Sequence, residues 1–430
     1  MPCILEPFMP THAPTGSILS SYDSTATLAL SPGTLTISNS LTLSGGVTNR
    51  FDLSDDPTGL LKTNDLIQVF GNLNVSGTNL LKFSLLDGLP GNGIYTLITY
   101  SGAFNGGLSN FALSGINGTL TNPPGAIAII VNAARPPATL VWTGNGANNF
   151  WDTGATVGWL NDGAPDRFYF LDDVVFDNTG ASNPIVTLAG DLTPGSVTVN
   201  ATAAYTFTGN GRITGSTGLA KANSGTLTLL TTNDYTGPTV ISGGAVSVSR
   251  LDNGGAPSPL GAAAVESTNL VLSSGTLRYT GGSTTTDRGA TFSGAGAIFD
   301  VVNAGTTLTW TGTNVGSGAL IKSGAGTLVL SANNSFAGGT VLSNGTLALD
   351  GPAGGGTVTA NNYALGSGSV TFHGGTLKLF GYGLSTSPSY GTFNRPLIVP
   401  AGATGTLLTP PRYTLSSSLS GAGTLNLEVN

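Results

Sequence analysis

One stretch of the chain gathers residue types that could carry chemistry on a sugar. Two indoles, Trp151 and Trp159, precede a short acidic run that also contains Arg167. Indole rings could stack on a sugar, and two or three converging carboxylates are what a glycosidase or lyase needs for acid and base catalysis. The same oxygens could hold a calcium ion. The acidic residues are Asp162, Asp166, Asp172, Asp173 and Asp177.

A structural interpretation of the same residues is favoured. The aromatic side chains would close the end of a hydrophobic core, and the aspartates would lie in turns. Glycan or calcium binding by the two indoles and the five aspartates ranks second, and catalysis ranks last. The sequence therefore predicts no catalytic residue, no metal site and no cofactor, and the protein is not expected to be an enzyme.

The two histidines do not change this expectation. His12 and His373 form no recognisable catalytic pair, and His373 aligns with Ser273 in a repeat described below. A repeat position that exchanges histidine for serine is predicted to be a solvated strand residue. Nucleotide-binding, serine-hydrolase and zinc-protease motifs do not occur with the flanking strands and helices that they require.

Composition excludes several further classes of protein. Charged residues make up 8% of the chain, the net charge is -7, and the 14 lysines and arginines are scattered singly, so nucleic acid is not an expected partner. One cysteine, Cys3, excludes an internal disulfide framework. No stretch approaches the ~20 apolar residues of a membrane-spanning helix. Any export signal or anchor is expected to lie outside this chain.

A Gly-Thr-Leu tripeptide recurs through the second half of the chain. It begins at Gly225, Gly275, Gly326, Gly375 and Gly423, so successive copies stand about 50 residues apart. Residues 219–249 also align with residues 320–350 at a constant offset of 101, which places Lys221 on Lys322, Asn233 on Asn334 and Tyr235 on Phe336. The alternate copies are the more similar ones, so the repeat unit is about 101 residues long.

Most predicted strands alternate Leu, Val, Ile or Phe with Thr, Ser or Asn, and Gly, Asn, Asp or Pro punctuates their ends. Repeats related by translation favour parallel stacking, so an all-β parallel β-helix with about 20 to 25 residues per coil is expected. Asn233 and Asn334 are expected at corners, where amides can stack into ladders. The cations Lys221, Lys322, Arg278 and Lys378 would recur along the solenoid as a weak ligand surface. Predicted strands include 25–30, 34–37, 41–43, 66–70, 126–131, 227–230 and 328–330.

Proline pairs and tryptophans suggest the domain boundaries. Residues 1–20 are expected to be irregular, and 21–134 to form a β-rich end module of a preceding solenoid array. Residues 139–215 would form an opening module rich in Trp and Asp. Residues 216–430 would hold the repeats, with units near 219–319 and 320–418 and a truncated copy at 419–430, as in a window on a longer protein.

The residues GAGTLVLSANNSFAGGTVLSNGTLAL (324–349) resemble the autotransporter-associated β-strand repeat, also called the passenger-associated transport repeat, of bacterial surface proteins. Residues 219–249 are a looser copy, with Pro238 in place of the second glycine of the Gly-Gly pair. The resemblance implies a right-handed β-helical passenger that is exported and then displayed or released. Neither a C-terminal membrane barrel nor a sorting tail is visible in this sequence.

The expected function is that of a structural and interaction protein at the cell surface or outside the cell. A surface glycan or the extracellular matrix would be its partner, contacted through many weak contacts from outward Thr, Ser and Asn side chains. The alternatives are a carbohydrate-binding module centred on residues 142–177 and, less favoured, a polysaccharide-cleaving β-helix.

Overall fold

The computed structural model describes residues 4–5, 32–60, 62–86, 90–116, 118–131, 137–349, 363–379, 392–409 and 414–429. The chain forms two compact units, Met1–Pro137 and Ala138–Asn430. The predictions for the segment 1–20 and for a strand at 25–30 fall outside the described residues, apart from a two-residue strand, β1 (Ile4–Leu5). Cys3 and His12 lie outside them as well.

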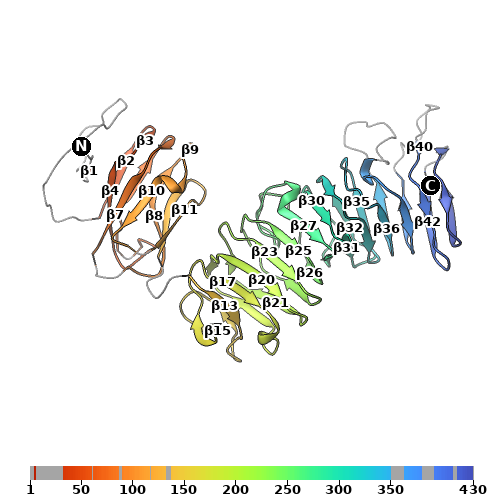
Figure 1. Cartoon of the computed structure of the whole chain (residues 1–430), viewed down its shortest axis with the longest axis horizontal. Coiled ribbons are helices and arrows are strands. Elements are labelled where there is room, and N and C mark those ends of the chain that lie inside the picture. The colour runs from red at the N-terminus through yellow and green to blue at the C-terminus, as the bar shows by residue number, and fades with distance from the viewer. Residues whose placement is uncertain are drawn as a thin grey trace. The chain divides into compact units, whose positions relative to one another are not determined.

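The first unit is a short stack of three coils (Figure 1). Each coil contributes one strand to each of three parallel ladders, and the inward Leu, Val, Ile and Phe side chains form one buried cluster. The ladders are β2 (Thr34–Ile37), β5 (Leu66–Val69) and β8 (Gly93–Tyr100); β3 (Leu41–Leu43), β6 (Leu73–Val75) and β9 (Phe104–Asn105); and β4 (Thr48–Leu53), β7 (Asn79–Leu85) and β10 (Phe111–Ser114). Strand β1 extends the last of these ladders by pairing parallel with β4. A short 3-10 helix, η1 (Leu108–Asn110), precedes β10.

An antiparallel hairpin closes this stack. Strand β12 (Ala126–Val131) pairs antiparallel with β8 on one side and with β11 (Gly118–Thr121) on the other. All six residues of β12 are buried, which explains why the sequence reads as a continuous apolar run there.

The second unit is a longer parallel solenoid with three faces (Figure 1). The first sheet contains β13 (Thr139–Trp142), β15 (Val157–Asn161), β16 (Ala164–Arg167), β17 (Asp173–Phe176), β20 (Ser196–Asn200), β23 (Leu219–Ala222), β25 (Thr239–Ile241), β27 (Leu270–Ser273), β30 (Ala290–Ser293) and β33 (Asn314–Gly316). The second contains β14 (Phe150–Trp151), β18 (Ile185–Leu188), β21 (Tyr205–Gly209), β24 (Thr226–Leu229), β26 (Ala245–Val248), β28 (Thr276–Tyr279), β31 (Ala297–Val301), β34 (Leu320–Ser323), β36 (Thr340–Leu342), β38 (Val370–Phe372), β41 (Leu397–Ile398) and β44 (Leu419–Ser420).

The third face is built from shorter runs. It contains the pair β19 (Asp191–Leu192) and β22 (Arg212–Ile213), then β29 (Thr284–Thr286), β32 (Thr307–Trp310), β35 (Thr327–Leu330), β37 (Thr346–Leu349), β39 (Thr376–Lys378), β42 (Thr404–Thr409) and β45 (Thr424–Val429). Strands β40 (Thr392–Phe393) and β43 (Thr414–Leu415) form a separate pair. Each follows a strand of the third face and precedes a strand of the second sheet, so each stands at the first-sheet position of its coil. Two 3-10 turns, η2 (Asn178–Gly180) and η3 (Ser267–Asn269), interrupt the coils. The all-β parallel β-helix predicted from the sequence is confirmed.

The Gly-Thr-Leu tripeptide has a direct structural meaning. In each of the first four periodic copies the leucine is buried, and the threonine is only partly covered. The glycine lies against the preceding coil: a Cβ atom on Gly225 would stand 2.1 Å from the carbonyl oxygen of Ala203, and one on Gly326 would stand 2.5 Å from that of Asn303. The tripeptide therefore holds one coil directly on the next.

The two copies of the repeat unit occupy different faces. The first begins with β23 on the first sheet, whereas the second begins with β34 on the second sheet. From β23 to β33 the chain takes four steps along the first sheet, and β34 is the next strand of the same coil. One repeat unit therefore spans four complete coils and one additional face of the solenoid. Residues at matching positions of the two copies consequently lie on neighbouring faces of the solenoid.

The coils differ in length. Successive strands of the first sheet begin at Ser196, Leu219, Thr239, Leu270 and Ala290, so the coil that starts at Thr239 is the longest of these four. This long coil carries an excursion between β26 and β27. It exceeds the roughly 20 to 25 residues per coil expected from the sequence.

Candidate functional site

The tryptophans at the start of the second unit are core residues. Trp151 and Trp159 are 0% and 1% exposed, and their rings meet edge to face at 5.6 Å. Phe176 lies within 5.5 Å of both rings, so the cluster seals the first coils. Strands β16, β15 and β13 form this end of the first sheet, and β15 pairs antiparallel with both of its neighbours. Neither indole offers a face to a sugar, and the alternative that they stack on a glycan is wrong.

The five aspartates are distributed over separate turns and strand ends. Asp162 and Gly163 both have positive φ and form the two-residue turn between β15 and β16. Asp166 accepts a hydrogen bond from Asn161 Nδ2 at 3.0 Å. Asp177 caps η2 by accepting from Thr179 N at 2.8 Å.

Asp172, directly before β17, and Asp173, its first residue, lie on opposite sides of the chain. Asp172 is fully buried and accepts hydrogen bonds from the amides of Ala138 and Tyr169 at 2.8 and 2.7 Å. Asp173 is exposed and accepts from Ser196 Oγ at 2.6 Å. In the described ranges, no group of three or more His, Cys, Asp or Glu residues could hold a metal ion.

Lys221 and Lys322 are buried, which the sequence analysis missed. Lys221 Nζ donates to the carbonyl oxygens of Ala222, Asn223 and Gly243 at 2.6, 2.9 and 3.4 Å. Lys322 makes the equivalent contacts with Ser323, Gly324 and Asn344. Each lysine therefore joins the corner of its own coil to the corner of the next. The two lysines do not form a surface of recurrent cations. The signal that could have shown this is their place in the alternation, two residues after the inward Leu219 and Leu320.

Burial lowers the pKa of both lysines to about 8 from the ordinary 10.5. Between these two values the unfolded chain binds more protons than the folded chain, so stability should rise with pH. We expect the free energy of unfolding to increase from pH 7.5 to 9.5 by about 2 kcal/mol for each lysine. Urea denaturation at the two pH values measures this.

The double variant Lys221→Met, Lys322→Met should lose that increase, whereas the exposed control Lys378→Met should keep it. The range stops at pH 9.5 because burial raises the pKa of Tyr205 and Tyr235 to about 12, which lowers stability above their ordinary value of 10. An increase that survives in the double variant would contradict the assignment to these lysines.

Asn233 and Asn334 do not form an amide ladder, because they belong to different faces. Each is buried and bridges three coils instead. Asn233 Oδ1 accepts from Ile213 N at 3.0 Å, and its Nδ2 donates to Pro259 O at 3.0 Å. Asn334 accepts from Asn314 N and donates to Ala364 O. The side-chain amide replaces a missing strand of the ladder at this corner.

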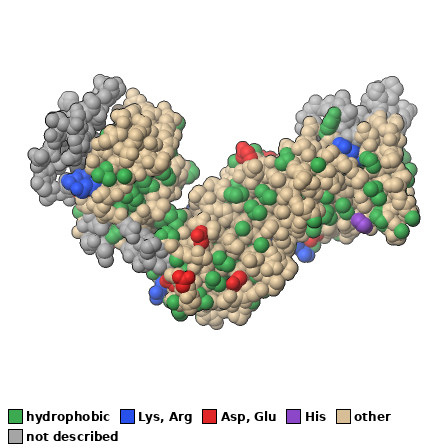
Figure 2. Space-filling view, in the orientation of Figure 1, with side chains coloured by type: hydrophobic (Ala, Val, Ile, Leu, Met, Phe, Trp, Pro, Cys, Tyr) green, Lys and Arg blue, Asp and Glu red, His purple; other side chains and the backbone are tan. Residues whose placement is uncertain are grey.

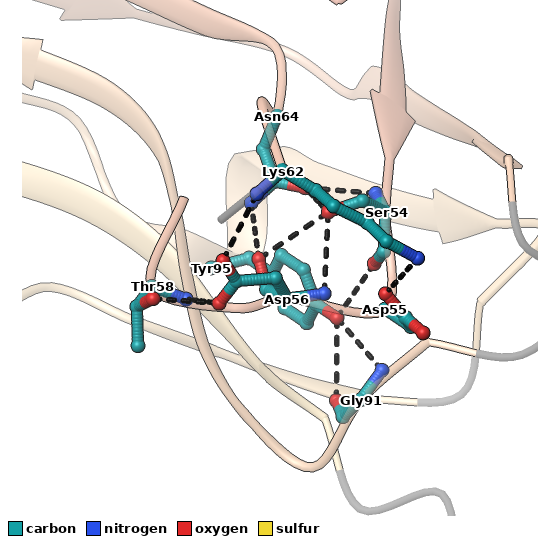
Figure 3. Close-up of polar contacts among 8 residues, drawn as sticks. All are labelled: Ser54, Asp55, Asp56, Thr58, Lys62, Asn64, Gly91 and Tyr95. Atoms are coloured by element: carbon teal, nitrogen blue, oxygen red, sulfur yellow. Dashed lines mark hydrogen bonds and ion pairs between the residues drawn. The ribbon is translucent and has the colours of Figure 1, made fainter. Parts of the chain in front are cut away.

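A polar loop of the first unit centres on Asp56 (Figure 3). Asp56 accepts hydrogen bonds from the amide and hydroxyl of Thr58 at 3.0 and 2.6 Å and from Lys62 N at 3.2 Å. Lys62 Nζ pairs with Asp55 at 2.7 Å, and the Tyr95 hydroxyl donates to Ser54 O. The acidic groups of this loop therefore hold its own turn together.

The surface seen in Figure 2 carries few charges. Several charged side chains of the protein form ion pairs, such as Arg212 with Asp191 and Arg250 with Asp252. His373 is exposed as predicted, but it directly follows β38 and is not a strand residue. Within the described ranges, no helix has both the length and the apolar character that crossing a bilayer requires. The face shown in Figure 2 thus has few charged side chains, and the described residues discussed above do not converge on a reactive centre.

These features define a protein of the parallel β-helix class whose coils are joined by recurring Gly-Thr-Leu, Lys and Asn positions. Residues 219–248 and 320–349 match the family model of the passenger-associated-transport-repeat. The chain thus carries two repeats of this family, and the resemblance predicted from the same residues is confirmed. The truncated third copy at 419–430 stays a prediction.

A stretch of 178 residues, 40% of this chain, is 46% identical to the Adhesin BmaC autotransporter of Brucella suis biovar 1 (strain 1330). The match covers 5% of that protein, so this chain spans a small part of its relative's length. No solved structure matches the chain.

Proposed function

We propose that this chain is a segment of an exported passenger β-helix that acts outside the cell as an adhesive rod. The observation that carries the proposal is the 46% identity to an autotransporter adhesin, together with the two passenger-associated repeats. A continuous hydrophobic core from Leu140 to Leu407 gives such a rod its stiffness.

The positions of the aspartates support a binding role without catalysis. Asp172 is buried, Asp162 forms a hairpin turn, and Asp177 caps a 3-10 helix. A polysaccharide-cleaving site needs carboxylates that converge on one exposed surface. On this proposal the unchanged chain cleaves no polysaccharide. The variant Asp173→Ala should bind as the unchanged chain does and should likewise cleave no polymer.

The partner that we propose is the extracellular matrix or a surface glycan, contacted at many weak points. The third sheet offers an ordered row for this purpose. Thr327, Thr346, Thr376 and Thr406 lie in register on four successive coils, and all are partly exposed. Coils stack at about 4.8 Å, so the row places one hydroxyl group at each step. Many weak contacts along one rod add up through multivalency.

The test is adhesion of the purified full chain, coupled to beads, to cultured epithelial cells and to plates coated with matrix proteins or neutral polysaccharides. We expect saturable binding to at least one of these surfaces. A variant with Thr327, Thr346 and Thr376 changed to Val keeps the β-branched shape and removes three hydroxyl groups. We expect its binding to be about tenfold weaker.

The matched control changes Thr206, Thr226 and Thr228 on the second sheet to Val, and it should bind like the unchanged chain. Beads that adhere to none of the surfaces would overturn the adhesive role. Equal binding by both triple variants would keep adhesion and reject the threonine row as its basis.

A further inference from the structure

The excursion between β26 and β27 is held by residues from the following coil. Arg288 is 4% exposed, and its guanidinium lies beneath this loop. Nε donates to Asp252 O at 2.9 Å, and Nη2 donates to Gly261 O at 2.7 Å and Ser258 Oγ at 3.2 Å. Nη2 also lies 3.3 Å from the carbonyl oxygens of Asn253 and Ala256.

The neighbouring side chains complete this contact. Asp287 Oδ1 accepts from Gly254 N at 2.7 Å, and its own amide donates to Asn253 Oδ1. The Thr286 hydroxyl donates to Asp252 O at 3.1 Å. Three consecutive residues, Thr286 to Arg288, thus bind both the donors and the acceptors of the loop backbone.

The second repeat unit has one matching arginine contact. Arg395 Nη2 donates to Gly366 O, which is the counterpart of Gly261 O. The surrounding backbone bonds also match: Ala262 N donates to Tyr235 O, and Ser367 N donates to Phe336 O, each at 2.8 Å. Both glycines lie against these aromatic rings, where a Cβ atom would approach the ring to 3.0 Å or less. The contact is therefore a recurring feature of the fold.

Both arginines lie outside the residues that match the family model, 219–248 and 320–349. Arg288 follows Gly261 at a sequence separation of 27, whereas Arg395 follows Gly366 at a separation of 29. Because the separation differs between the copies, a gapless comparison of the two units misses the pair. A structural unit that includes the arginine is longer than the repeat motif and ends on the next coil.

We propose that Arg288 is a clamp that lets the loop 250–269 leave the solenoid without opening the stack of coils. No strand of the third sheet lies between β26 and β27, so the carbonyl groups of the loop lack a neighbouring strand. A buried carbonyl without a donor costs free energy, and the rigid five-donor fork of arginine can serve several at once. The clamp makes this loop a rigid insertion point, whose tip can change while the coils stay paired.

The experiment compares Arg288→Met with Arg250→Met in the full chain. Arg250 belongs to the same loop, but its side chain is 56% exposed and pairs with Asp252 at the surface. Timed proteinase K digestion with mass spectrometry measures the rate of cleavage within residues 250–265. We expect that rate to rise at least tenfold in Arg288→Met and less than twofold in Arg250→Met.

A second arm tests the insertion directly. A short Gly-Ser peptide placed after Gly255, where a Cβ atom would meet no other atom within 4 Å, should leave thermal unfolding unchanged in the parent chain. The same insertion should lower the unfolding temperature in the Arg288→Met background. Equal tolerance in both backgrounds, or an unchanged cleavage rate in Arg288→Met, would overturn the clamp.

If Arg288→Met fails to fold, the variant Arg288→Lys tests the clamp instead. Lysine keeps the positive charge and the aliphatic stem but loses the fork of donors. We expect the chain to fold with the loop cleaved faster than in the parent. Cleavage at the parent rate would overturn the proposal.

Discussion

Replacing Gly225 by alanine is expected to destabilise the second unit by about 3 kcal/mol, the upper end of the usual cost of overpacking. The new Cβ atom would stand 2.1 Å from Ala203 O and 2.7 Å from Ala201 O, both backbone atoms of the preceding coil. A backbone carbonyl cannot rotate away as a side chain can, so two coils must separate locally. Urea denaturation followed by tryptophan fluorescence measures this, because all four tryptophans lie in the second unit.

The matched control is Gly282→Ala. No atom lies within 4 Å of the Cβ position at Gly282, and no positive φ is required there. Its effect should stay within about 0.5 kcal/mol. Equal unfolding midpoints for the two variants would show that the Gly-Thr-Leu glycine is not needed for coil contact.

Replacing Trp151 by alanine is expected to cost about 4 kcal/mol, as is typical of deleting a large buried aromatic side chain. Its ring contacts Trp159, Phe168 and Phe207 at centroid distances of 5.5 to 5.9 Å, so the deletion would leave a cavity at the first coils. The same urea titration measures the loss. Any decrease in binding by this variant should follow the fraction of unfolded protein.

Two phenylalanine variants sharpen this prediction. Within the described residues Trp151 Nε1 has no hydrogen-bond partner, whereas Trp142 Nε1 donates to Asn183 O at 3.0 Å. Trp151→Phe should therefore cost clearly less than Trp142→Phe, which leaves a carbonyl without its donor. Loss of glycan binding by a fully folded Trp151→Ala variant would contradict the structural role.

The strands could be predicted well, since their signal is local. Alternation of apolar and polar residues located Thr34–Ile37 and Leu41–Leu43, and a continuous apolar run located Ala126–Val131, at the bounds that the structure shows. In a β-helix the same alternation decides which side chains enter the core. The regular spacing of the tripeptide then indicates stacking without any knowledge of the partner coil.

The candidate site could not be predicted in the same way. Trp151 and Trp159 are of the residue type that stacks on sugars in carbohydrate-binding sites. Only their packing against Phe176 shows that they are buried. Lys221 and Asn233 are polar residues that a sequence places on the surface by default. They lie inside because corner carbonyls and amides of adjacent coils need partners there.

The amino-acid sequence alone is sufficient to establish an all-β stack of coils with two passenger-associated repeats. Small glycines, inward leucines and their spacing act between adjacent coils, and that information is contained in the repeat. The face that each unit occupies and the polar groups that become buried depend on how the coils pack in three dimensions. The 101-residue offset between the two units does not determine how far the second unit is rotated about the solenoid axis. The short coil that starts at Leu219 and the long coil that starts at Thr239 each complete one turn, although they contain different numbers of residues. Excursions such as the one held by Arg288 set how many coils fit in a unit, and hence which face the next repeat occupies.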